Sequence, residues 1–175
     1  MAGLTIPEVN ALGKEQFDAV FANVIELCTD AAVQAQKKKP FKDVRELCEA
    51  FVQYLDNLTE AEKLVILQLH PDLAGRLAAQ GALTRESSEE QRSAGLLDLS
   101  SEQMETINIR NQNYREKFGF PFIICARLNK VQSIIEGLQR RFNNSKEQEI
   151  SIGIDEVKKI CRLRILDIVE NDGSV

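Results

Sequence analysis

His70 is the only histidine of the chain, and it stands directly before a proline in the run Leu69-His70-Pro71. Its imidazole is the one side chain type that exchanges protons near neutral pH without a special environment. A proline disfavours the helical conformation at the residue before it, so we expect His70 to lie where an apolar helix ends. That position suits general acid–base catalysis, but it equally suits a histidine that only caps a helix C-terminus. The spacing leaves both alternatives open.

A hydroxyl, a carboxylate and an amide share one face of the polar helix expected over residues 85–94. They belong to Ser87, Glu90 and Gln91, which follow helical i, i+3 and i+4 spacing. A carboxylate close to His70 would orient the imidazole and raise its basicity. The alternative is the solvated face of a surface helix, which is typical of a segment rich in Ser, Glu and Gln.

The run Phe118-Gly119-Phe120-Pro121-Phe122 interrupts a long helix, because glycine and proline both break helices. We expect the apolar run that follows to start a new helix at its aromatic corner. The backbone N–H groups of Ile123, Ile124 and Cys125 would then point outward and bind an anion or a carbonyl oxygen. A packed aromatic turn is the alternative interpretation, and both can hold at once.

Arg164 places a positive charge on an apolar stripe of the last expected helix, formed by Val157, Ile160, Cys161 and Ile168. A partly buried guanidinium requires a carboxylate partner, either from the protein or from a ligand. Alternatively, its aliphatic stem packs against the stripe while the charged head reaches solvent.

Helical periodicity runs through nearly the whole chain, and no alternating strand pattern is present. Apolar spacing, capping residues and breakers predict helices over 17–28, 44–55, 59–69, 84–94, 100–118, 130–142 and 145–169. We therefore predict an all-α fold, a compact single-domain helical bundle over residues 1–175 with its core at about 14–169.

Composition excludes several functional classes. The net charge of −5 and the lack of a long Lys/Arg cluster argue against a nucleic-acid partner. No apolar run approaches the roughly 20 residues that span a membrane. The N-terminus does not show a basic region followed by an apolar one, so we expect no secretory signal. The cysteines Cys28, Cys48, Cys125 and Cys161 form no CxxC pair, so we expect buried, reduced thiols and no metal.

Four sequence segments, taken together, are more specific for a protein family than any one of them is alone. In order they are LHPDLAG at 69–75, TRESSEEQRSAGL at 84–96, NQNYREKFGFPFIICARL at 111–128 and EVKKICRLRILDI at 156–168. With them, residues 14–169 resemble the 2-oxo-4-hydroxy-4-carboxy-5-ureidoimidazoline (OHCU) decarboxylase family, whose members carry out the last of three steps from urate to (S)-allantoin. The HPDLAG and FGFPF segments with their spacing are the specific part of this resemblance.

The resemblance implies an all-α homodimer that acts on the small molecule OHCU without a metal or an organic cofactor. It implies that His70 is the catalytic acid or base and that Glu90 is its partner. It also implies that the remaining site residues bind substrate. Ser87 and Gln91 would hydrogen-bond the ring, Arg164 would contact its polar edge, and the pocket would be lined by Pro71, Phe122, Ile123, Ile124, Cys125 and Ala126.

The chain also departs from the family pattern. Ser88 and Glu89 stand where the family often has a glutamine and a basic residue, and the C-terminal Gly-Ser-Val is not a peroxisomal address. We therefore expect a cytoplasmic or peroxisomal location. Two alternatives to OHCU decarboxylation stay open: a non-catalytic helical interaction module of the same fold, and a decarboxylase of a related ureido or hydantoin acid.

Overall fold

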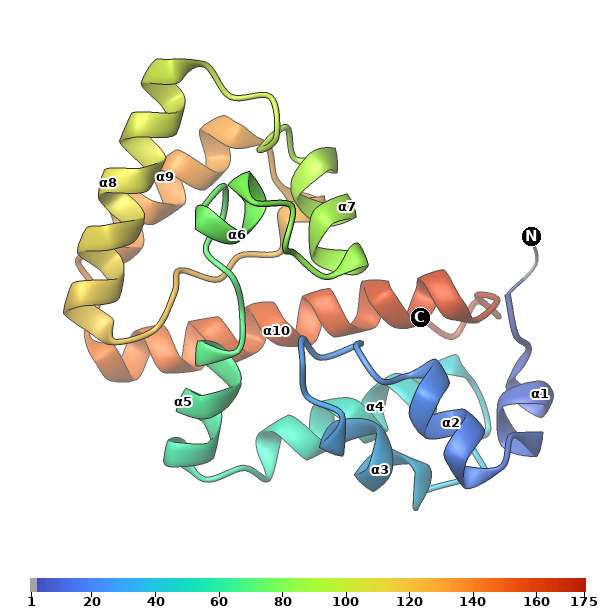
Figure 1. The fold of residues 1–175 in the computed structure, drawn as a ribbon. Helices are drawn as coiled ribbons and strands as arrows, with labels where there is room; N and C mark the ends of the chain where they lie inside the picture. Colours follow the sequence, from blue (N-terminus) through green and yellow to red (C-terminus); the bar gives the residue numbers. More distant parts are fainter. Residues whose placement is uncertain (1–2) are drawn as a thin grey trace. The chain divides into compact units, whose positions relative to one another are not determined.

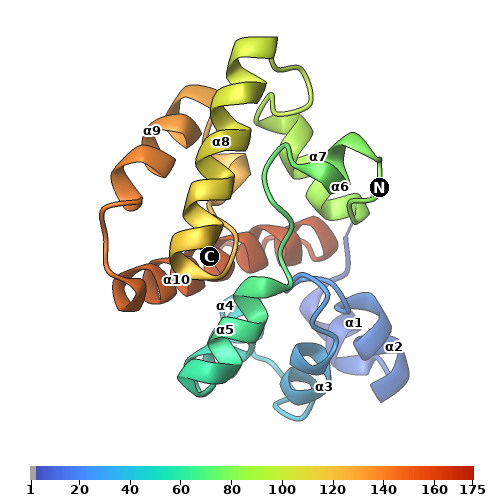
Figure 2. The ribbon, with the colours of Figure 1, turned by 60° about the vertical axis from the view of Figure 1, so that its left-hand side comes forward.

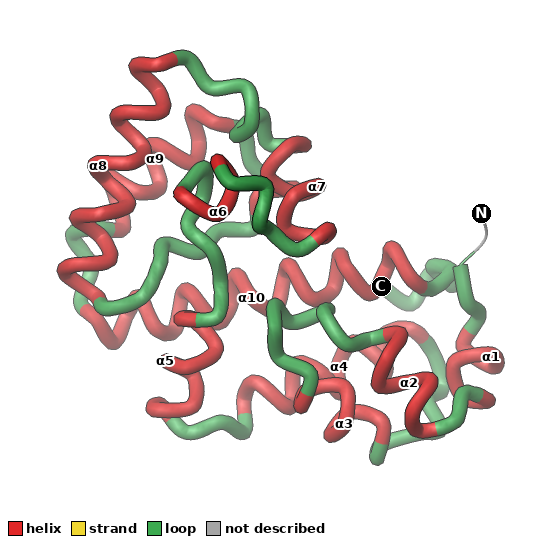
Figure 3. Tube along the Cα trace, viewed as in Figure 1, coloured by secondary structure: helices red, strands yellow, loops and turns green. Residues whose placement is uncertain are grey.

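The computed structural model describes residues 3–175, and over this range the regular structure is helical. It contains ten α-helices and one short 3₁₀ helix, and the described residues form no β-strand beyond a single bridge between Leu4 and Val169 (Figures 1 and 3). The prediction of an all-α fold is confirmed. The contacts divide the chain into two compact units, one of residues 3–62 and 158–175 and one of residues 63–157.

The first unit holds four helices and the end of the last one. They are α1 (Ile6–Ala11), α2 (Lys14–Val20), α3 (Asp30–Gln36), α4 (Val44–Asp56) and the C-terminal part of α10 (Lys146–Ile168). Helix α4 has an apolar face that recurs every three or four residues and is buried, formed by Val44, Leu47, Cys48, Phe51, Val52 and Leu55. Three aromatic rings extend this core. The ring centroids of Phe17 and Phe21 are 4.6 Å apart, and those of Phe21 and Phe51 are 6.0 Å apart.

The predicted helix over residues 17–28 is wrong in its length. Helix α2 ends at Val20, and the chain then turns irregularly until α3. Leu27 has a positive φ of 53°, and its N–H donates to the side-chain oxygen of Asn23 at 2.7 Å. That side-chain bond stands in place of a helical backbone bond. Leu27 is exposed and the neighbouring Cys28 is buried.

The second unit contains most of the predicted site residues. Its elements are the end of α5 (Glu60–Gln68), α6 (Arg76–Ala79), α7 (Arg85–Ser93), α8 (Ser101–Phe118), the 3₁₀ helix η1 (Ala126–Leu128), α9 (Val131–Arg141) and the start of α10. Helices α8 and α9 lie side by side in both ribbon views (Figures 1 and 2).

Capping residues set these boundaries as the sequence predicted. The side chains and backbone of Thr59 and Glu62 exchange hydrogen bonds of 3.2 and 2.8 Å before α5, and Ser145 and Gln148 do the same before α10. Helix α8 ends at Gly119, whose φ of 82° is strained for any residue with a side chain.

Two further predictions concern the burial of the cysteines and the length of apolar helices. All four cysteines are buried and none forms a disulfide, as expected. Among the described residues, no helix combines the length and the apolar character needed to cross a bilayer.

Candidate active site

His70 lies just after α5, where the following proline ends the helix. Its ring is buried, with 7% of the residue exposed, and Nδ1 is 2.9 Å from the carbonyl oxygen of Ile66. Because a carbonyl oxygen can only accept, Nδ1 carries the hydrogen and donates it. The neutral ring therefore keeps its lone pair on Nε2, the nitrogen that can exchange a proton.

The loop after His70 is held by side chains of α7 and α8. Gln91 accepts from the Ala74 N–H at 2.8 Å and donates to the Asp72 carbonyl at 3.4 Å. Asn111 donates to the Leu73 carbonyl at 2.8 Å. The loop that begins at His70 is thus fixed on helix α7 by the residue that directly follows Glu90.

The polar face of α7 is not a solvated surface. Ser87 is 5% exposed and Gln91 2% exposed, while Glu90 between them is half-buried. Thr84 starts this helix by accepting from the Ser87 N–H at 3.2 Å. The surface-helix interpretation is wrong for Ser87 and Gln91, and the amide of Gln91, predicted to contact substrate, binds the His70 loop.

The segment after Gly119 is extended, so the predicted helix start at Ile123 is wrong. Only the short η1 forms, from Ala126. Side chains occupy its backbone groups instead of a helical ladder: Arg141 donates to the Ile123 carbonyl at 2.7 Å, and the Cys125 N–H donates to Glu156 at 3.0 Å. The Cys125 N–H, one of three expected to face a ligand, is therefore satisfied within the protein.

Helix α7 packs against η1, which brings Glu90 close to this segment. Burial raises the pKa of the Cys125 thiol, and the negative charges of Glu156 and Glu90 raise it further. Helix α7, which carries Glu90 and Gln91, thus contacts the end of this segment, and Gln91 ties the helix to the His70 loop.

Arg164 lies in the other unit. Its Nη1 donates to Glu26 Oε1 at 3.0 Å and to the Asn23 carbonyl at 2.9 Å, and the ion pair is almost completely buried. The alternative in which the Arg164 head reaches solvent is therefore wrong. The predicted carboxylate partner is present, and the protein supplies it.

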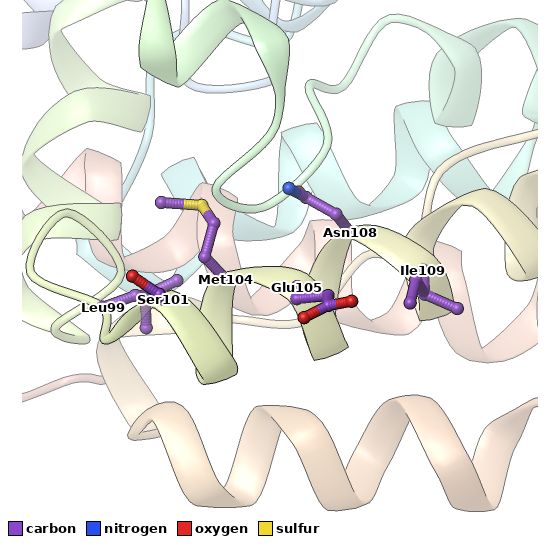
Figure 4. A pocket seen from close by; sticks show the side chains of 6 residues that line it. All are labelled: Leu99, Ser101, Met104, Glu105, Asn108 and Ile109. Atoms are coloured by element: carbon purple, nitrogen blue, oxygen red, sulfur yellow. The ribbon is translucent and has the colours of Figure 1, made fainter.

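An open pocket of about 480 Å³ lies on the first half of α8, away from the predicted site residues. Figure 4 shows the side chains that line it, Leu99, Ser101, Met104, Glu105, Asn108 and Ile109. Met104 and Ile109 are exposed. The pocket holds no histidine and a single carboxylate, so we do not assign it a role in acid–base catalysis.

The sequence analysis missed the polar residues that support the site. Asn111 and Tyr114 are buried on α8 between Ile107 and Phe118. The signal was available, since an amide and a phenol interrupt an apolar stripe at helical spacing. Their partners were not predictable, because they lie on other elements.

Comparison with known proteins identifies similar sequences and structures. The sequence profile described as OHCU decarboxylase matches residues 10–166. A Xenopus laevis protein named 2-oxo-4-hydroxy-4-carboxy-5-ureidoimidazoline decarboxylase is 42% identical over 164 residues, which cover 94% of each chain. A mouse protein of the same name is 38% identical, covering 93% of this chain and 91% of the relative.

The chain belongs to the OHCU decarboxylase family. Two solved structures share its fold. One, described as a crystal structure of OHCU decarboxylase in the presence of (S)-allantoin, has a TM-score of 0.66 and 23% identity, covering 81% of this chain and 92% of that one. The other, a crystal structure of (S)-allantoin synthase, has a TM-score of 0.77 and 20% identity, covering 95% of this chain but 54% of that one. This family membership agrees with the resemblance carried by HPDLAG and FGFPF.

Proposed function

We propose that this protein decarboxylates OHCU to (S)-allantoin and CO₂, the last step from urate to allantoin. Its membership of the OHCU decarboxylase family supports the substrate. The observation that carries the chemistry is the buried His70, whose Nδ1 is committed to the Ile66 carbonyl. That bond fixes the ring and its tautomer, and the proton transfer that we propose for His70 uses Nε2.

The proposed reaction does not need a cofactor to accept the electron pair that decarboxylation releases. When the C–C bond to the carboxylate breaks, CO₂ leaves and the electron pair stays on the ring, where adjacent unsaturated groups delocalise it. The ring hydroxyl then loses its proton as a carbonyl forms, the ring nitrogen that received the electron pair takes up a proton, and a second proton is added to the ureido-bearing carbon on one face. The protein must therefore orient the substrate, stabilise developing charge and control the proton.

In this proposal His70 and Glu90 handle the protons near the hydroxyl and carboxylate of OHCU. The other predicted residues bind and orient the molecule. Ser87 hydrogen-bonds the ring, and the walls are Pro71, Phe122, Ile123, Ile124, Cys125 and Ala126. The burial of Ser87 and the contact between helix α7 and η1 support this arrangement.

Freshly generated OHCU tests the proposal. The unaltered protein should accelerate CO₂ release and give optically active allantoin, measured by circular dichroism, whereas His70→Ala should give only the slow racemic background with its fold intact. An unaltered protein that leaves the product racemic would support the alternatives, a related acid as substrate or a non-catalytic module. An active His70→Ala would remove His70 from the mechanism.

We also propose that the protein is a homodimer, as the resemblance implies. Exposed apolar side chains, among them Leu97, Met104 and Ile109, are compatible with a contact between copies. Light scattering after size exclusion should give twice the mass of one chain, and a single-chain mass at micromolar concentration would contradict the dimer.

A further inference from the structure

A buried polar network lies beside the aromatic corner of the second unit. Arg141 Nε donates to Glu149 Oε1 at 2.9 Å, and the Tyr114 hydroxyl donates to the same oxygen at 2.5 Å. Asn144 donates to the other oxygen, Oε2, at 2.9 Å. Arg141 is 6% exposed and Glu149 is fully buried. Four elements therefore meet at one carboxylate: α8, α9, the following loop and α10.

The Tyr114 phenol keeps its proton in this network. Burial raises the pKa of Tyr114, and its bond to Glu149 raises it further. The phenol thus remains a donor across the pH range in which an enzyme is assayed. Arg141 stays charged at any such pH.

Stability alone does not explain this network. Burying a guanidinium and a carboxylate carries a large desolvation cost, and apolar side chains of similar size often fold as well or better. Arg141 also leaves Nη2 buried without a hydrogen-bond partner. An arrangement that leaves a donor unsatisfied is better explained by what its other atoms hold in place.

Those other atoms hold two consecutive residues of the extended segment. Arg141 Nη1 donates to the Ile123 carbonyl at 2.7 Å, and its guanidinium lies 4.4 Å from the centre of the Phe122 ring. Tyr114 contacts the same ring edge-on, with centroids 5.4 Å apart and planes at 82°. The ring of Phe122 and the carbonyl of Ile123 are thereby fixed from two sides.

We propose that Arg141, Glu149 and Tyr114 are positioning residues that set the place of the Phe122–Ala126 segment for substrate binding. The inference rests on the proposed function, in which this segment lines the substrate pocket. The network does not touch the reacting atoms. It determines where the substrate lies relative to His70, and hence how tightly it binds and which face receives the proton.

The decisive variant removes the network without leaving a buried charge. In Tyr114→Phe/Arg141→Met/Glu149→Leu all three polar partners become apolar, so the melting temperature should stay within about 5 °C of the unaltered protein. We expect KM for OHCU to rise about tenfold to a hundredfold, with a smaller change in kcat and a lower enantiomeric excess of allantoin. A residue with only a structural role would not change KM in a variant that folds.

The chain offers a matched control, because it contains only two tyrosines and both donate to a carboxylate. Tyr54, in the other unit, donates to Asp30 at 3.0 Å. Tyr54→Phe should leave KM and enantiomeric excess unchanged, whereas Tyr114→Phe should raise KM about threefold or more. This single pair decides the matter if the triple variant does not fold.

Hydrogen exchange of the ligand-free protein separates this inference from the proposed function. Backbone amides of residues 120–126 should exchange about tenfold faster in the triple variant or in Tyr114→Phe, and not in Tyr54→Phe. A folded triple variant with KM within about twofold of the unaltered protein overturns the inference while the proposed function stands. If the unaltered protein does not process OHCU, the proposed function fails, and unchanged exchange would then refute the positioning role as well.

Discussion

At the scale of single residues, the bond from His70 Nδ1 to the Ile66 carbonyl assigns the two ring nitrogens different tasks. Nδ1 holds the ring in place, and in the proposed reaction Nε2 exchanges the proton. The sequence predicted the place of His70 from one proline. It did not predict the tautomer, which depends on a carbonyl one helical turn earlier.

Two amide replacements separate these tasks. His70→Asn places an N–H near the position of Nδ1, so it should keep the bond to Ile66 and the melting temperature while kcat falls about 10²- to 10⁴-fold. His70→Gln should lose as much activity and also stability, because its amide extends toward the position of Nε2. Steady-state rates with thermal melts check both, and a His70→Asn protein with normal kcat would contradict the role of Nε2.

The buried Arg164–Glu26 pair gives a second prediction at this scale. Glu26→Ala leaves a guanidinium uncompensated in the interior, and should lower the free energy of unfolding by about 3–5 kcal/mol. The exposed pair of Lys14 and Asp18 is the comparison: Lys14→Ala should cost less than about 0.5 kcal/mol. Urea denaturation measures both, and equal losses would show that burial does not govern this ion pair.

The partner of Arg164 shows where residue-level prediction stops. Periodicity placed Arg164 on a buried stripe, and that placement was right. Glu26 was hidden because its segment was interpreted as a continuous helix. The irregular turn that follows α2 contains the bond between Asn23 and Leu27, which depends on side-chain geometry that an apolar pattern does not contain.

At the scale of elements, signals from residues close in sequence predicted the helix starts well. Structure that depends on contacts between residues far apart in sequence was predicted poorly. The caps at Thr59, Thr84, Ser100 and Ser145 set helix starts through contacts three residues away, so they could be recognised from the sequence. The extended segment after Gly119 could not, because its backbone is satisfied by Arg141 and Glu156 rather than by neighbours along the chain.

The loop after His70 is one such element, and Asn111 provides its test. Asn111→Ala removes the donor to the Leu73 carbonyl inside the protein, so we expect a loss of about 1–3 kcal/mol in stability. Because the loop positions His70, kcat should fall as well.

Asn113, on the exposed side of the same helix, is the control for Asn111. Asn113→Ala should change the stability by less than about 0.5 kcal/mol and leave the rate unchanged. Chemical denaturation and OHCU turnover measure both variants. A fully active Asn111→Ala would show that the loop keeps its place without this bond.

At the scale of the whole molecule, buried acids with raised pKa values make the fold sensitive to alkali. Burial raises the pKa of Cys48 to about 11, with Arg162 partly opposing it, and burial also raises the pKa values of Cys161, Cys125 and Tyr114. In the unfolded chain the thiols ionise near pH 9, while the folded chain keeps these protons. Proton linkage therefore makes stability fall as the pH rises above about 9.

Thermal melts in the presence of a reductant test this prediction. The melting temperature should be nearly flat between about pH 7 and 8.5 and then fall steadily toward pH 11. Cys48→Ala should make the fall shallower, since it removes one of the groups that release a proton on unfolding. An unchanged melting temperature up to pH 11 would mean that these thiols ionise equally in both states.

The four thiols can also report local unfolding of the protein, because they are distributed over both units. Cys28, Cys48 and Cys161 lie in one unit and Cys125 lies in the other, on the segment assigned to the substrate. An alkylating reagent reaches such a sulfur only while its surroundings are transiently unfolded. Mass spectrometry of the labelled peptides would therefore measure the rate of local unfolding in each unit separately. It would also show whether a bound ligand slows this unfolding in one unit or in both.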